Sequence, residues 1–171
     1  DSRNISDLVR QNILEMKPYA SARDEFSGSA SVFLDANENP LNEPLNRYPD
    51  PRQLELKRTI SNIKNVPVES VFLGNGSDEA IDLLFRVFCE PGIDNTIIPE
   101  PTYGMYRVCA DINNTIIIPQ LLTDDFQPQT QKILESVNEK TKLIFLCSPN
   151  NPTGAVYSAA ELAELGRVLN D

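Results

Sequence analysis

Hydrophobic residues recur at helix and strand spacings, in alternation, from residue 51 to the end of the chain. Ile81, Leu84, Phe85 and Phe88, for example, occupy the i, i+3, i+4 and i+7 positions of one helix face. Between such segments stand short apolar runs of strand length. The pattern predicts helices over 52–63, 77–91, 103–112, 128–137 and 158–171, and strands over 71–73, 96–98, 115–118 and 143–147.

This alternation indicates an α/β fold. Parallel strands need an intervening element to bring the chain back, and a helix usually supplies it. We therefore predict a mostly parallel sheet with helices on both faces. Ligands bind such sheets outside the carboxyl ends of the strands. The loops 74–79 and 148–154 both follow predicted strands, so we expect them at that edge.

Before residue 51 the pattern is irregular. A short amphipathic helix is predicted around Leu8 to Leu14, and Pro18 and Gly28 interrupt the segment after this helix. The stretch from Pro40 to Pro51 contains four prolines among polar residues, which is typical of a loop. We expect an N-terminal arm here rather than part of the core.

Charge restricts the partners. The 171 residues include 25 acidic and 15 basic side chains, for a formal net charge of -10. A nucleic-acid partner is not expected, because phosphate backbones bind to basic faces. A bound phosphate ester would be held mainly by backbone N–H groups. The absence of histidine excludes histidine bases, Ser-His triads and histidine-ligated metals from this stretch.

The cysteines and the hydropathy pattern indicate the compartment. Cys89, Cys109 and Cys147 have neither paired nor ligand-like spacing, so we expect buried free thiols and no metal site. The segment Asp1 to Arg10 is charged and polar, and no apolar run is long enough to span a bilayer. The expectation is a cytoplasmic protein without a membrane partner.

The first candidate site is Gly74-Asn75-Gly76-Ser77-Asp78-Glu79. Two glycines allow a close approach of the backbone to a ligand, and the helix after them offers unpaired N–H groups, with Ser77 and Asp78 expected at its N-cap. The segment lacks the Walker ending and the third glycine of the dinucleotide fingerprint, so a phosphate monoester fits better than ATP or NAD. The alternative is a plain glycine turn before a capped helix.

Two other turns are expected at the same edge. In Pro101 to Tyr106, the ring of Tyr103 could stack on a flat heteroaromatic ligand, or Tyr103 and Tyr106 could simply pack with their hydroxyls at the surface. In Ser148 to Gly154, two prolines fix a polar turn in which an asparagine can aim its amide at a ligand oxygen or form an Asx turn.

Together these motifs resemble a known family. The string Asn151-Pro152-Thr153-Gly154 after a hydrophobic strand resembles the signature of fold-type I pyridoxal-phosphate aminotransferases. Other segments resemble the histidinol-phosphate type in the same order: Leu34 to Pro40, Arg47 to Pro51, Gly76 to Glu79, Cys89 to Gly92 and Pro101 to Tyr106. The resemblance covers nearly the whole chain. It implies an N-terminal arm and small-domain segment over 1–50, and the first part of the large, cofactor-binding domain over 51–171.

The resemblance implies a role for four residues toward pyridoxal 5'-phosphate. The backbone amides of Ser77 and Asp78 would hold its phosphate, which agrees with the argument from the helix terminus. Tyr103 would stack on the pyridine ring, and Asn151 would donate a hydrogen bond to the phenolic oxygen of the ring.

Three more residues match positions outside this group. Tyr48 resembles the tyrosine that reaches the cofactor phosphate of the neighbouring subunit, which implies a homodimer. Tyr19 and Asn37 match positions near the substrate. The implied reaction is transamination of L-histidinol phosphate with 2-oxoglutarate in histidine biosynthesis, with small molecules as the only substrates.

In this family the cofactor is bound through a Schiff-base lysine that lies well after the Asn-Pro-Thr-Gly turn, and thus beyond Asp171. Lys57, Lys64 and Lys142 are not in a matching context, so no catalytic residue is assigned within the segment and the chain alone is predicted to be inactive. Two alternatives stay open: a related fold-type I enzyme, such as a threonine-phosphate decarboxylase or an aromatic aminotransferase, and a non-catalytic module of aminotransferase shape.

Overall fold

The computed structural model describes residues 4–20, 26, 28, 30–32, 34, 36–39, 41, 45 and 48–170. The chain divides into two compact units. One unit comprises Asp1–Glu15 and Gly74–Asp171, and the other comprises Met16–Leu73. The domain boundary predicted at residue 50 stays a prediction. Parts of the motifs 34–40 and 47–51, namely Asp35, Pro40 and Arg47, lie outside the described residues.

A three-stranded parallel sheet forms the centre of the first unit. Its strands are β1 (Asn95–Glu100), β2 (Ile116–Leu121) and β3 (Thr141–Ile144), in the spatial order β2-β1-β3. Ile97 of β1 lies opposite Ile118 on one side and Ile144 on the other. Because β1 pairs along both edges, it is the most buried strand, with residues 95–99 all buried.

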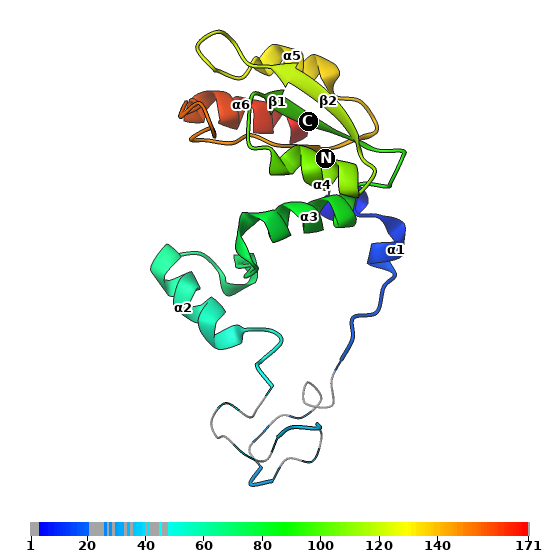
Figure 1. The fold of residues 1–171 in the computed structure, drawn as a ribbon, viewed down its shortest axis with the longest axis vertical. Helices are drawn as coiled ribbons and strands as arrows, with labels where there is room; N and C mark the ends of the chain where they lie inside the picture. Colours follow the sequence, from blue (N-terminus) through cyan, green and yellow to red (C-terminus); the bar gives the residue numbers. More distant parts are fainter. Residues whose placement is uncertain are drawn as a thin grey trace. The chain divides into compact units, whose positions relative to one another are not determined.

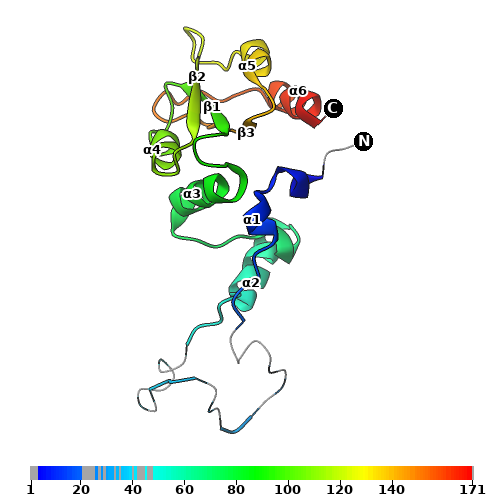
Figure 2. The same ribbon diagram turned by 90° about the vertical axis from the view of Figure 1, so that its right-hand side faces the viewer.

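Helices cover both faces of this sheet, as Figures 1 and 2 show. The pair on one face is α3 (Gly76–Phe88) and α4 (Met105–Ile112), and the pair on the other is α5 (Thr130–Ser136) and α6 (Ala159–Asn170). Among the residues described, the predicted α/β architecture with a parallel sheet and helices on both faces is confirmed.

Two hydrophobic clusters, one on each face, hold the layers together. On the first face, Phe85 of α3 and Cys109 of α4 pack with β-strand residues that include Ile117. On the second, Ile97 packs against Ile133 of α5, with Leu165 of α6 in the same cluster. Successive residues of a strand point to opposite faces, which explains why Ile117 and its neighbour Ile118 belong to different clusters.

One predicted strand is wrong. Val71 has an extended backbone, with φ -105° and ψ 115°, but residues 71–73 form no strand. A strand exists only where a neighbour accepts and donates its backbone hydrogen bonds, and neither β2 nor β3 pairs with this segment within the described chain. Its surroundings in the second unit are instead the helix α2 (Leu54–Lys64) and the short 3-10 turn η2 (Val68–Ser70).

The arm begins in the first unit. The predicted helix over 8–14 is two short turns, the 3-10 turn η1 (Ile5–Leu8) and α1 (Gln11–Leu14). Arg10, between them, attaches the arm to the last turn of α3: its guanidinium donates to the carbonyl of Arg86 at 3.0 Å and pairs with the carboxylate of Glu90 at 2.9 Å. The arm thus contacts α3 at the helix end opposite to Ser77 and Asp78.

The thiols are free, as predicted, with Cys89 and Cys109 buried and Cys147 half-buried. Burial raises the pKa of Cys89 to about 11, so this thiol stays protonated at neutral pH. Within the described ranges, no cluster of acidic or cysteine side chains could hold a metal ion. No helix in the same part of the chain has the length and apolar character that crossing a membrane requires.

Ile133 on α5 tests the packing of the second face. Ile133 is 0% exposed, so in the full-length protein Ile133→Ala should lower the free energy of unfolding by about 2–5 kcal/mol through lost contacts and a cavity. The neighbouring exposed Lys132 is the control, and Lys132→Ala should change the free energy of unfolding by less than about 0.5 kcal/mol. Denaturant unfolding measures both. Equal midpoints for the two variants would contradict the assigned packing.

Candidate functional site

The start of α3 provides the first part of the candidate site. The N-cap is Asn75, not Ser77 or Asp78 as predicted, because the helix already begins at Gly76. The side chain of Asn75 makes no capping hydrogen bond. The N–H groups of Ser77 and Asp78, to which such a cap would bond, are therefore left without that partner.

Gly76 makes this helix start accessible. It has a positive φ of 74°, and nothing lies within 4 Å of the position that a Cβ atom would take. The backbone N–H of Asn75 is bonded to the carboxylate of Glu79 at 2.5 Å. Exposed N–H groups in the first turn of a helix attract anions. The geometry suits an oxyanion such as a phosphate.

A hydrogen bond joins α3 to the turn after β1. The hydroxyl of Tyr103 donates to Oδ1 of Asp78 at 2.9 Å, across 25 residues of sequence. This bond raises the pKa of Tyr103, because the acceptor is an anion that favours the protonated phenol. It also brings the loop 74–79 to the edge where β1 ends, although no strand precedes that loop.

Aromatic contacts support Tyr103 from the sheet side. The ring of Tyr106 meets that of Tyr103 edge to face, with centroids 5.7 Å apart, and stacks on Phe145 at 4.7 Å. Burial raises the pKa of Tyr106 to about 12. Tyr103 and Tyr106 are both half-buried and packed together. The stacking of Tyr103 on a ligand stays a prediction.

The turn after β3 is attached to the same place by Asn150. Its side chain is buried and fully paired: Oδ1 accepts from the hydroxyl of Thr102 at 2.7 Å, and Nδ2 donates to the carbonyl of Pro101 at 2.9 Å and to the hydroxyl of Thr153 at 3.0 Å. Two backbone bonds close the turn, from Asn150 to Ala155 and from Gly154 back to Asn150, both at 2.7 Å. Asn150 thereby joins the turns that carry Tyr103 and Asn151.

Asn151 itself is exposed, directly before a cis peptide bond to Pro152. Cis bonds also precede Pro101 and Pro149 in these two turns. The structure therefore brings Asp78 and Tyr103 into contact, and the bond between Thr102 and Asn150 joins the turns that carry Tyr103 and Asn151. Ser77 lies next to Asp78 in the first turn of α3. Their roles toward a ligand stay predictions.

The other three predicted residues belong to the second unit. Tyr19 is 91% exposed and Tyr48 is 66% exposed. The backbone N–H of Tyr48 donates to a carboxylate oxygen of Glu38 at 2.9 Å, next to the exposed Asn37. Their predicted roles, at the substrate and at a neighbouring subunit, are not tested by these contacts.

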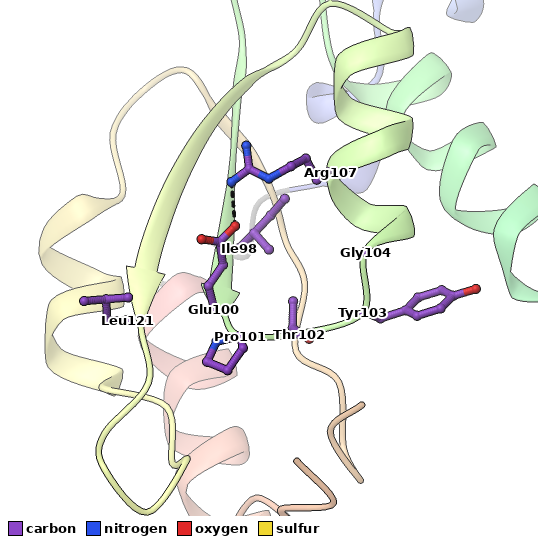
Figure 3. A pocket seen from close by; sticks show the side chains of 8 residues that line it. All are labelled: Ile98, Glu100, Pro101, Thr102, Tyr103, Gly104, Arg107 and Leu121. Carbon is purple, nitrogen blue, oxygen red and sulfur yellow. Dashed lines mark hydrogen bonds and ion pairs between the residues drawn. The ribbon is translucent and has the colours of Figure 1, made fainter. Parts of the chain in front are cut away.

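A hollow of about 430 Å³ lies beside the ends of β1 and β2. Arg107 and Glu100 form an ion pair across it, at 2.5 Å. In Figure 3 the ring of Tyr103 points away from these residues. Thr102 and Tyr103 also line this hollow, so it adjoins the group formed by Asp78, Tyr103 and the turn after β3.

Two contributions escaped prediction from sequence. The sequence does not distinguish Asn150 from its neighbour Asn151, and it predicts no role for the carboxylate of Asp78. Asn150 and Asn151 both lie between Pro149 and Pro152, so the sequence indicates an asparagine that satisfies backbone groups of the turn but does not say which one. For the contact of Asp78 with Tyr103, local sequence carries no signal.

Asn150 can be tested by stability. In the full-length protein, Asn150→Ala should lower the free energy of unfolding by about 2–4 kcal/mol, because the partners of its side chain lose their hydrogen bonds in a buried place. Asn62→Ala, on the exposed surface of α2, is the matched control and should change it by less than about 0.5 kcal/mol. Denaturant titration compares them. If both variants unfold like the wild type, Asn150 does not join the two turns.

Comparison with known proteins bears on the nature of the site. The chain is 57% identical over 166 residues to the histidinol-phosphate aminotransferase of Bacteroides thetaiotaomicron. This alignment covers 96% of this chain and 48% of that relative. Among solved structures, alanine aminotransferase from Pyrococcus furiosus matches with a TM-score of 0.60 at 28% identity, over 67% of this chain and 31% of its own. Cystalysin from Treponema denticola, whose structure contains a pyridoxal 5'-phosphate cofactor, matches with a TM-score of 0.60 at 25% identity, over 67% and 32%.

The chain thus spans about half the length of the curated relative. The sequence profile of aminotransferase class I and II matches residues 24–171. Both findings confirm the family to which the motifs pointed, and the solved relatives agree with the observed parallel sheet. The chain belongs to the aminotransferase class I and II family.

Proposed function

We propose that this chain is the cofactor-cradling part of an enzyme that uses pyridoxal 5'-phosphate to transfer an amino group between L-histidinol phosphate and 2-oxoglutarate. The observation that carries the proposal is the convergence of three loops through the Asp78–Tyr103 and Thr102–Asn150 hydrogen bonds. The identity of 57% to a histidinol-phosphate aminotransferase favours this substrate over those of other family members.

The side chains and N–H groups at this edge fit the cofactor. The N–H groups of Ser77 and Asp78 suit its phosphate, since Asn75 does not cap them and Gly76 leaves open space beside them. The ring of Tyr103 offers a flat face for the pyridine ring. Asn151, exposed in its turn, has an amide donor for the ring oxygen. When bound, the cofactor supplies an electron sink for the carbon that loses its proton.

Within the proposal, this chain binds and orients the ring, and a lysine beyond Asp171 forms the covalent bond to it. The six lysines here are Lys17, Lys57, Lys64, Lys132, Lys140 and Lys142. None is in the sequence context of the family lysine. The acid that pairs with the pyridine nitrogen and the arginines for substrate anions belong to the same missing half of the relatives' length.

The second unit is proposed to serve the substrate and a neighbouring subunit. Tyr48 would reach the cofactor phosphate of a second copy, which makes the proposed enzyme a homodimer. Its exposed ring is compatible with such a contact. Tyr19 and Asn37 would lie near the substrate. The three free thiols support a reducing, cytoplasmic setting.

Turnover by the full-length protein tests the function. The protein that contains this chain should develop the visible absorbance of bound cofactor and should convert histidinol phosphate with 2-oxoglutarate, with a kcat/KM at least about tenfold above that for aromatic amino acids. The 171-residue chain alone is the control and should give no turnover. A preference for aromatic amino acids, or decarboxylation of threonine phosphate, would favour a related enzyme, and cofactor binding without turnover would favour a non-catalytic module.

Asn151 is tested by titration of the bound cofactor. Asn151→Ala should raise the pKa of the visible absorbance transition by about one unit, because the ring oxygen loses a hydrogen-bond donor that stabilises its anionic form. Asn62→Ala on the exposed surface of α2 should leave that pKa unchanged. A pH titration of the full-length protein measures both. An unshifted transition in Asn151→Ala would remove Asn151 from the cofactor site.

A further inference from the structure

The carboxylate of Asp78 has no role in the proposed function, which uses only the backbone N–H of this residue. The structure nevertheless gives that carboxylate a specific partner, the hydroxyl of Tyr103 at 2.9 Å. Both side chains are half-buried, and they come from different elements, the first turn of α3 and the turn after β1. Asp78 thus faces the expected phosphate through its backbone N–H, and it contacts Tyr103, the expected stacking residue, through its side chain.

We propose that Asp78 is a positioning residue that holds the ring of Tyr103 in its stacking orientation, so that phosphate binding and ring stacking at the cofactor are coupled. This inference rests on the proposed function, because it assumes that the cofactor occupies this edge of the sheet. The inference adds a side-chain interaction between Asp78 and Tyr103, to which the proposed function gives separate roles.

The ring of Tyr103 is held at two points. At its tip, the hydroxyl donates to Asp78. At its side, the ring of Tyr106 meets it at an interplanar angle of 87°, and Tyr106 is itself stacked on Phe145, which directly follows β3. A ring that is held by a single contact can still rotate about that contact, whereas two contacts define the plane of the ring. Loss of the hydroxyl contact leaves only the edge contact with Tyr106.

The proposed role of the Asp78 carboxylate is that of a hydrogen-bond acceptor for the hydroxyl of Tyr103. A negative charge beside a phosphate is repulsive, in a chain whose net charge is already -10. The hydrogen bond to Asp78 raises the pKa of Tyr103, so its hydroxyl stays a donor across the neutral range. A neutral acceptor of the same shape should therefore replace the aspartate with little change in cofactor binding.

A double-mutant cycle in the full-length protein tests the coupling. The variants are Asp78→Ala, Tyr103→Phe and the double variant, and the readouts are the dissociation constant for pyridoxal 5'-phosphate and the visible circular dichroism of the bound ring. Each single change should weaken binding about threefold to tenfold and reduce the dichroism. The double variant should be no more than about twofold weaker than the weaker single variant, because the two groups act as one unit.

Two controls separate this role from a general effect on the helix. Asp78→Asn keeps an acceptor and should bind within about twofold of the wild type, with its dichroism restored. Glu79→Gln changes the adjacent acid, whose partner is the N–H of Asn75, and its effect should multiply with that of Tyr103→Phe.

The outcomes are distinct. Effects of Asp78→Ala and Tyr103→Phe that multiply, or an Asp78→Asn variant as weak as Asp78→Ala, would overturn the coupling and leave the proposed function intact. A wild-type protein that binds no pyridoxal 5'-phosphate would overturn both proposals.

Discussion

The pairing of β1 with a strand on each side is the constraint on which the candidate site depends. Parallel neighbours end at the same edge, so the turns after β1 and β3 must meet although 48 residues separate Thr102 from Asn150. Once they meet, the amide of Asn150 satisfies groups from both turns and needs no charge to do so. The sheet brings the two turns to the same edge, and the hydrogen bonds of Asn150 hold them next to each other.

The acidic side chains at this edge of the sheet are hydrogen-bonded within the protein. The first turn of α3 contains two acidic side chains, and each accepts a hydrogen bond from another residue. Glu79 accepts from the N–H of Asn75, and Asp78 accepts from the hydroxyl of Tyr103. The N–H groups of Ser77 and Asp78 remain directed to the helix start. Backbone donors of this kind need no cluster of lysines or arginines, so the acidic charge of the chain is compatible with the proposed phosphate site.

Much of the fold was predictable because its signal is local. Periodicity placed β1 to β3 and the helices around them within a few residues, and the opposite clusters of Ile117 and Ile118 follow from strand alternation. Residues 71–73 show the limit: their composition favours a strand, but strand formation depends on a partner that local sequence does not specify. The site divides in the same way. The sequence predicts turns at Ser77, Tyr103 and Asn151, but it places the N-cap of α3 later in the chain than Asn75. The bond between Asp78 and Tyr103 exists only once α3 and the turn after β1 have packed.

The docking of Arg10 connects the arm to the helix that begins at the candidate site. Its guanidinium contacts the carbonyl of Arg86 and the carboxylate of Glu90, where the negative end of the α3 dipole lies. The same helix begins at Gly76 with the N–H groups proposed to bind phosphate. A substitution of Arg10 would therefore act on the end of the helix whose other end carries the proposed phosphate donors.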